Sequence, residues 1–136
     1  MQQIAFPLSA SIYAKDAKRL ASFYADVLGL SPAEEGLSYI LLASNQLELA
    51  IVQAPERIAQ SVEVATPPRV REETPIKISF LVSDIEQIRQ RVETLGGLLK
   101  EASLAWSWRG VIHIDGHDPE GNVFQLRQAS GKISEN

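Results

Sequence analysis

The sequence Ser-Ile-Tyr-Ala-Lys-Asp at residues 11–16 has a counterpart in Ser-Phe-Leu-Val-Ser-Asp at residues 79–84, which is displaced by 68 residues (from 11 to 79). Each segment is followed by residues with helical spacing and then by Leu-Gly, at 28–29 and at 95–96. A second pair occurs in the same order, because Asn-Gln-Leu-Glu-Leu at 45–49 resembles Asn-Val-Phe-Gln-Leu at 122–126. Internal similarity of this kind predicts two copies of one structural module.

Two amphipathic helices are expected after the two aspartates. Asp16 is a suitable N-cap for the first helix, and Gly29 suits a left-handed residue just past its end. At the start of the second helix, Ser83 and Glu86 have the spacing of a capping box. The apolar stripes follow i, i+3, i+4 and i+7 spacing and consist of Leu20, Phe23, Tyr24, Val27 and Leu28, and of Ile85, Ile88, Val92 and Leu95.

Alternating apolar and polar residues predict strands that are covered by the helices on one face and polar on the other. The polar face would carry Ser9, Ser11 and Tyr13 from the first strand of module one, Glu48 from its last strand, and Lys77, Ser79 and Gln125 from module two. Further short strands are expected near 39–43, 98–100 and 111–115.

The whole chain is expected to form a single domain. Module one spans about 7–53 and module two about 76–128, with a tail at 129–136. The stretch 54–75 contains four prolines and mixed charges, so we expect a surface loop that connects the modules.

Composition narrows the classes of function. The 136 residues carry a formal charge of −4, which argues against nucleic acid or an anionic membrane as a partner. The absence of cysteine excludes disulfides, thiolate metal sites and a cysteine nucleophile. No secretion signal and no apolar run of membrane-spanning length is present, so a cytoplasmic protein is expected.

Three motifs resemble the vicinal oxygen chelate superfamily: Phe-Tyr at 23–24, Val-Leu-Gly-Leu at 27–30, and Asp-Pro-Glu-Gly-Asn at 118–122. That superfamily includes glyoxalase I, bleomycin and fosfomycin resistance proteins, methylmalonyl-CoA epimerase and extradiol dioxygenases. The resemblance covers residues 7–127. It implies an α+β fold of two β-α-β-β-β modules, whose sheets form a cup with the helices outside. It also implies a homodimer and a small-molecule ligand.

Metal-dependent members of this superfamily hold a divalent ion with four side chains in the cup. Motif alignment places the corresponding first-strand positions at Ser9 and Lys77 and the last-strand positions at Glu48 and Gln125. The internal repeat gives the same positions. Residue 77 lies 68 positions after residue 9, which is the displacement of the first repeated pair, and residue 125 lies 77 positions after residue 48, which is the displacement of the second. A serine is a poor ligand, and an ammonium group has no lone pair. We therefore expect no metal or other cofactor, with Lys77 paired to Glu48; the alternative is a divalent metal held by Glu48 and Gln125.

The remaining candidates for the cup are aromatic and basic. Trp106 and Trp108 would stack on a planar ligand, with Arg109 binding an anionic group, or they would anchor the edge of the sheet. His113 and Asp115 would face the cup, and His113 would act as a general base, as a metal ligand or as a structural hydrogen-bonding residue. His117 is expected in a turn or at the surface. The complete expected ligand-binding set is Ser9, Ser11, Tyr13, Glu48, Lys77, Trp106, Trp108, Arg109, His113 and Gln125.

Two classes of function follow. The first is a metal-free protein that binds a small molecule in the cup, like the bleomycin resistance proteins. The second is an enzyme of the glyoxalase, epimerase or dioxygenase type, with an altered metal-ligand set in which Glu48, Gln125 and His113 converge. No catalytic residue is assigned from the sequence.

Overall fold

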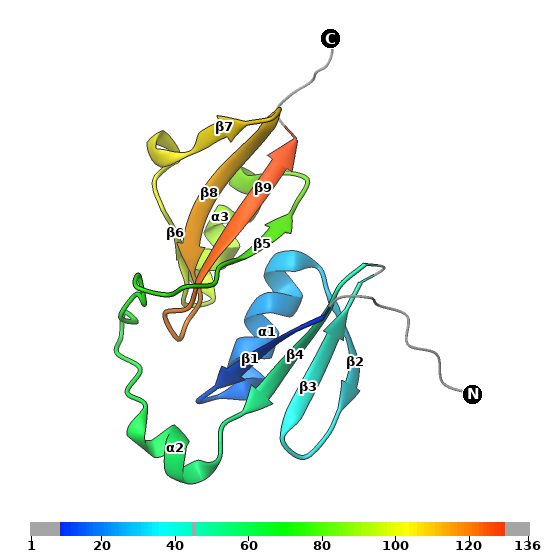
Figure 1. The fold of residues 1–136 in the computed structure, drawn as a ribbon, viewed down its shortest axis with the longest axis vertical. Coiled ribbons are helices and arrows are strands. Elements are labelled where there is room, and N and C mark those ends of the chain that lie inside the picture. The colour runs from blue at the N-terminus through cyan, green and yellow to red at the C-terminus, as the bar shows by residue number, and fades with distance from the viewer. Residues whose placement is uncertain (1–8, 45, 130–136) are drawn as a thin grey trace, which may run out of the picture. The chain divides into compact units, whose positions relative to one another are not determined.

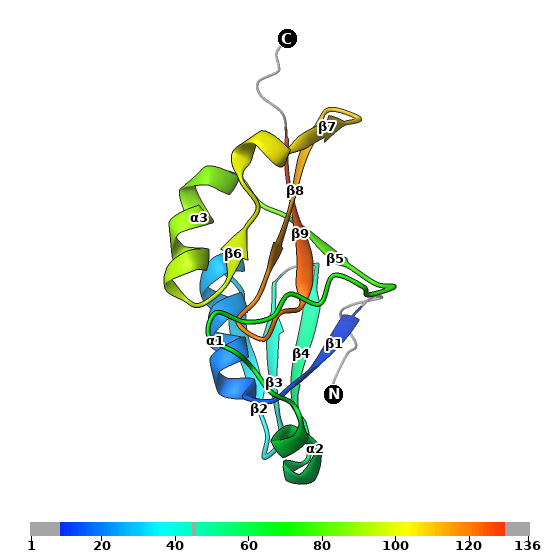
Figure 2. The same cartoon turned by 90° about the vertical axis from the view of Figure 1, so that its left-hand side faces the viewer.

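The computed structural model describes residues 9–44 and 46–129 and has mixed α+β architecture. The chain divides into two compact units, residues 1–63 and 64–136. Within each unit, a helix lies on one face of an open sheet, as Figures 1 and 2 show from two directions. None of the helices among the described residues is long and apolar enough to cross a membrane.

The first unit contains one complete β-α-β-β-β module. Its sheet has the strand order β1-β4-β3-β2, in which β1 runs parallel to β4 and the other pairs are antiparallel. The elements are β1 (Ser9–Ala14), α1 (Ala17–Leu28), β2 (Ser31–Glu35), β3 (Tyr39–Ala43), β4 (Glu48–Gln53) and a short final helix, α2 (Glu56–Ser61).

Helix α1 begins and ends where its sequence predicts. The Asp16 carboxylate accepts a hydrogen bond of 3.1 Å from the backbone N–H of Arg19, and Gly29 has a φ angle of 67°. The apolar stripe of the helix packs against β1, β3 and β4. This core includes Leu20, Phe23, Tyr24, Val27, Leu42, Leu49 and Ile51, all buried.

The second unit repeats the module with one additional strand. Its sheet has the order β5-β9-β8-β6, and the additional strand β7 also pairs with β8. The elements are β5 (Ile78–Leu81), α3 (Ile85–Thr94), β6 (Leu98–Leu99), a 3₁₀ turn (Ala102–Leu104), β7 (Trp106–Trp108), β8 (Val111–His117) and β9 (Val123–Ala129). The two-module organisation predicted from the internal repeat is therefore confirmed.

Four local features differ from the expectations. Asp84, not Ser83, caps α3, because its Oδ1 atom accepts from the N–H groups of Glu86 and Gln87 at 3.1 and 3.3 Å. The β-α-β-β-β module implies a strand between α1 and β3, but the sequence does not reveal its position at β2, which contains Pro32 and is exposed throughout. Strand β7 was not predicted either, because three exposed residues give no clear alternation. The expected surface loop 54–75 includes α2, a helix of six residues that follows Pro55.

The Asp-Pro-Glu-Gly-Asn turn at 118–122 sets the start of β9. The buried Asp118 carboxylate accepts hydrogen bonds from the backbone N–H groups of Glu120 and Asn122 at 2.8 and 3.0 Å. The backbone N–H of Arg71 donates to the carbonyl oxygen of Gly121 at 2.8 Å. The turn thereby anchors part of the connection between the modules, and it delivers β9 to its position between β5 and β8.

Candidate functional site

The face of the second sheet opposite α3 collects most of the predicted site residues. Strand register places His113 of β8 between Trp106 of β7 and Arg127 of β9. In the neighbouring row, Gln125 of β9 lies between Asp115 of β8 and Ser79 of β5. Because directly paired residues point to the same side of a sheet, these two rows form one continuous polar and aromatic surface. We call it the open face of the second unit.

A chain of hydrogen bonds crosses this open face. The Nε atom of Arg127 donates to Ser79 Oγ at 2.8 Å, and Ser79 Oγ donates to Gln125 Oε1 at 2.7 Å. The amide nitrogen of Gln125 lies 3.5 Å from Asp115 Oδ1. The ammonium group of Lys77 donates to both carboxylate oxygens of Asp115, at 3.1 and 2.9 Å. These contacts fix the orientation of four polar side chains from three strands and of Lys77, which directly precedes β5.

Beside this chain of hydrogen bonds lies an aromatic cluster. The Trp106 ring stacks on the His113 ring with centroids 5.2 Å apart and planes inclined by 12°. Trp108 meets the same imidazole at 6.2 Å and 54°. The indoles remain 43% and 61% exposed, whereas His113 is buried and its Nδ1 atom lies 3.1 Å from the carbonyl oxygen of Val111. Exposed indole surface held by a buried partner is a suitable platform for a planar ligand.

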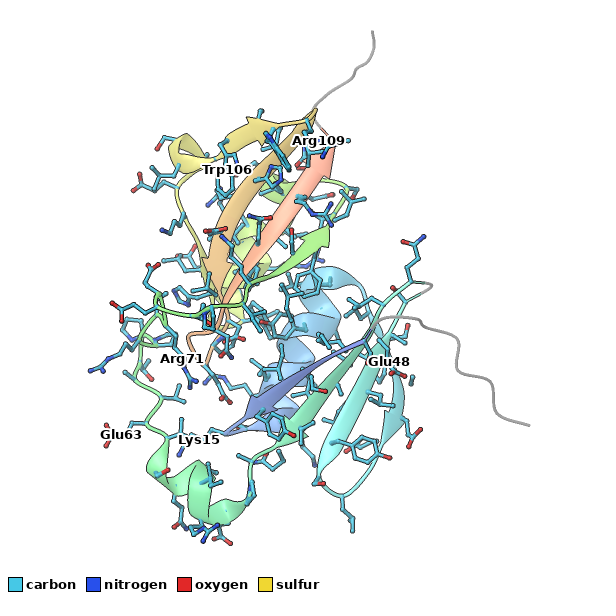
Figure 3. The ribbon with its side chains drawn as sticks, in the orientation of Figure 1. Lys15, Glu48, Glu63, Arg71, Trp106 and Arg109 are labelled. Atoms are coloured by element: carbon cyan, nitrogen blue, oxygen red, sulfur yellow. The ribbon has the colours of Figure 1, made fainter. Side chains whose placement is uncertain are left out.

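The hairpin that joins β7 to β8 holds an arginine in an unfavourable backbone conformation. Arg109 has a φ angle of 55° and Gly110 one of 75°. A two-residue hairpin loop with positive φ at both positions favours Asn-Gly, because a β-carbon is disfavoured there. The guanidinium carbon of Arg109 lies 5.2 Å from the centre of the Trp108 ring, within cation–π range. Figure 3 shows Trp106 and Arg109 at this end of the second sheet.

The other predicted residues lie on the first unit. Ser9, Ser11 and Tyr13 of β1 pair with Glu48, Ala50 and Val52 of β4 and share the face opposite α1. Tyr13 is 70% exposed. In the described part of the first unit, no hydrogen bond or ion pair engages the half-buried Glu48 carboxylate. That these residues and the open face of the second unit line one cup stays a prediction.

Residues that occupy matching positions in the internal repeat do not have matching partners in the two sheets. Ser9 is the direct partner of Glu48, but the direct partner of Gln125 is Ser79 rather than Lys77. The two modules thus differ by two residues in the pairing of their first and last strands. Such a shift leaves every side chain on its original face, so the alternation in the sequence does not reveal it.

The residues at the expected metal positions of the second unit are engaged in other contacts. The amide oxygen of Gln125 accepts a hydrogen bond from Ser79, and Lys77 brings a positive charge to Asp115. Among the residues that the structure describes, no three or more His, Asp or Glu side chains are grouped so that they could hold a metal ion. This donor set does not fit the divalent ion that metal-dependent superfamily members hold.

Three residues of the open face were not included in the predicted ligand-binding set: Ser79, Asp115 and Arg127. Alternation from Lys77, His113 and Gln125 already placed them on the same face, so the signal was present in the sequence. The carboxylate that meets Lys77 within its own unit is Asp115; the expected pair of Lys77 with Glu48, in the other unit, stays a prediction. His117 corrects an expectation, since it is buried at the end of β8 rather than in a turn or at the surface.

Comparison with known proteins assigns the family. The model of the glyoxalase-like domain matches residues 9–127, and the chain therefore belongs to this family, within the vicinal oxygen chelate superfamily. No curated protein matches the sequence.

Solved structures share the fold at low sequence identity. A glyoxalase/bleomycin resistance protein/dioxygenase family enzyme from Burkholderia phytofirmans is 17% identical, with a TM-score of 0.66 over 89% of this chain and 96% of that one. The fosfomycin resistance protein FosX from Listeria monocytogenes is 17% identical, with a TM-score of 0.63 over 96% of this chain and 97% of the other. At this identity, the likeness establishes the fold.

Proposed function

We propose that this glyoxalase-like protein binds a small molecule on the open face of the second unit without a divalent metal. The observation that supports the proposal best is the hydrogen-bonded chain from Arg127 through Ser79 and Gln125 to Asp115. In this chain of hydrogen bonds, Gln125, which occupies an expected metal-ligand position, is engaged by Ser79 instead. The same chain holds charged side chains beside the exposed indole rings. Most protein sites for small molecules combine apolar surface with a few oriented polar groups in this way.

The second candidate is a metal-dependent enzyme of the lyase, epimerase or dioxygenase type. The observation in its favour is the Glu48 carboxylate, which in the described part of the first unit has no partner and lies next to Ser9. A carboxylate of this kind is available to a cation. Gln125 would have to leave Ser79 to become its co-ligand.

Metal analysis of protein purified without chelators separates the two candidates. We expect less than stoichiometric zinc, nickel, iron and manganese, and no rise in melting temperature when these ions are added. A bound ion that Glu48→Gln and Gln125→Ala each remove would overturn the metal-free proposal. Glu56→Gln is the matched control, because Glu56 lies at the start of α2, outside both sheets.

Assembly and location form part of the same proposal. The resemblance to the superfamily supports a homodimer. The sequence pattern, with neither a secretion signal nor a long apolar run, supports a cytoplasmic location. Light scattering on the full chain measures the assembly, and a monomer at all concentrations would contradict it. Fractionation of cells that express the chain tests the location, and recovery outside the cytoplasm would contradict it.

A further inference from the structure

The guanidinium group of Arg127 is held in place through its Nε atom, and its two terminal nitrogens are left available for a ligand. Its Nε atom donates a hydrogen bond to the hydroxyl oxygen of Ser79, and that hydroxyl donates in turn to the amide oxygen of Gln125. In the described part of the second unit, no acidic side chain forms an ion pair with Arg127. The two terminal nitrogens of a guanidinium group match the two oxygens of a carboxylate, and a group that is already oriented loses little entropy on binding.

The register of the strands places this arginine in line with the aromatic cluster. Arg127 pairs with His113, and His113 pairs with Trp106. Strands lie about 4.8 Å apart, so the backbones that carry Arg127 and Trp106 are about 9.6 Å apart. The imidazole between them is buried and nearly parallel to the Trp106 ring, so it covers one face of that indole and leaves the rest of the indole surface exposed. A fused aromatic ring with one acidic substituent matches this arrangement.

The charges on the open face favour an anion. Lys77 neutralises Asp115, the one carboxylate on the two rows, through its two hydrogen bonds. Arg109 and Arg127 remain as uncompensated positive groups in the described part of this face. This local excess contrasts with the formal charge of −4 of the whole chain. A cationic ligand at the indoles would meet like charge, because Arg109 lies 5.2 Å from the centre of the Trp108 ring and Lys77 lies 6.0 Å from the centre of the Trp106 ring.

The conformation of Arg109 adds an independent observation. A residue at positive φ other than glycine, asparagine or aspartate is uncommon, and such strain concentrates at functional sites. Here the strain places a second guanidinium group against the Trp108 ring. Asparagine would suit the turn better, so turn geometry does not account for an arginine at this position.

We infer that the ligand is a planar aromatic anion, whose ring packs against the exposed surfaces of Trp106 and Trp108 and whose carboxylate or equivalent acidic group is held by Arg127. This inference rests on the proposed function and names the ligand class for the same site. The guanidinium group of Arg109 lies against the Trp108 ring. Ser79 is a positioning residue, because it acts through Arg127.

Three matched probes test the inference: 2-naphthoate, 2-naphthamide and cyclohexanecarboxylate. The amide has the same ring without the charge, and the third probe has the charge without the aromatic ring. The readout is the pair of indole N–H signals in a proton–nitrogen correlation spectrum, because Trp106 and Trp108 are the only tryptophans in the chain. We expect 2-naphthoate to shift both signals saturably, and each of the other probes to bind at least about tenfold more weakly.

Variants locate the anion. Arg127→Gln is expected to weaken 2-naphthoate binding by about tenfold or more and 2-naphthamide binding by less than about twofold. Arg127→Lys keeps the charge but loses the two-pronged geometry, so an intermediate loss is expected. Arg57→Gln on α2 removes the same unit of charge from an exposed helix and serves as the control. The dispersion of the spectrum shows directly that each variant is folded.

The outcomes separate the inference from the proposed function. If 2-naphthamide binds as tightly as 2-naphthoate, or if Arg127→Gln and Arg57→Gln behave alike, the anion assignment is wrong while small-molecule binding stands. If none of the probes shifts the indole signals, the aromatic-anion inference is overturned. If a metal ion rather than any organic probe shifts these signals, the proposed metal-free function fails as well.

Discussion

The Nε atom of Arg127 and the Oγ atom of Ser79 lie 2.8 Å apart and join β9 to β5 through a side-chain hydrogen bond. Ser79 uses the same hydroxyl to donate to Gln125 at 2.7 Å. A single hydroxyl group therefore connects a charged side chain to the amide that occupies one of the expected metal positions. Removal of this hydroxyl tests whether the open face is a preorganised unit.

Ser79→Ala is expected to lower the free energy of unfolding by about 1–2 kcal/mol, because two partly buried hydrogen bonds are lost. Urea denaturation measures the change. Ser107→Ala on the exposed strand β7 is the matched control and should change stability by less than about 0.5 kcal/mol. Equal effects of the two substitutions would show that Ser79 does not support Arg127.

The ion pair between Lys77 and Asp115 is expected to contribute little to stability. Their side chains are 36% and 20% exposed, and solvent weakens such a pair. Lys77→Met should cost less than about 1 kcal/mol, and a double-mutant cycle with Asp115→Asn should give a coupling energy of about 0.5 kcal/mol. A parallel cycle with Glu48→Gln tests the pair expected from the sequence. A coupling of about 3–5 kcal/mol there, typical of a buried pair, would show that Glu48 is the dominant partner.

Arg109→Asn is expected to raise the free energy of unfolding by about 0.5–1 kcal/mol, since asparagine tolerates positive φ better than arginine. Thermal denaturation measures this gain. The same variant should bind 2-naphthoate more weakly, so that stability and affinity change in opposite directions. A fall in stability would indicate that Arg109 is retained for its contact with Trp108 and not for a ligand.

Gly121→Ala is expected to destabilise the protein by about 3 kcal/mol or more. Gly121 has a φ angle of 87°, and a β-carbon there would come within 1.9 Å of the carbonyl oxygen of Arg69. Gly110 also has positive φ, at 75°, but a β-carbon there meets no atom within 4 Å. Gly110→Ala should therefore cost only about 1 kcal/mol. A similar loss of unfolding free energy for the two variants would argue that the segment around Arg69 does not pack against the turn at 118–122.

Much of the fold follows from local chemistry that a sequence displays. Asp16 caps α1 and Gly29 ends it because a side-chain acceptor and a residue without a β-carbon are needed at those points. Alternation places Glu48 and Gln125 on the face opposite the helices because successive residues of a strand point to opposite sides. The two modules were identifiable because each carries the same sequence of such signals.

Strand register and side-chain partners required the tertiary structure. A shift of two residues preserves alternation, so the sequence did not show that Ser79 rather than Lys77 lies beside Gln125. The partnership of Lys77 with Asp115, 38 positions later in the chain, depends on how β5, β9 and β8 are ordered in the sheet. The sequence by itself determined the modules and the faces of their strands, because these depend on local spacing. Only the tertiary structure decided which side chains meet, because contacts between distant segments depend on strand order and register.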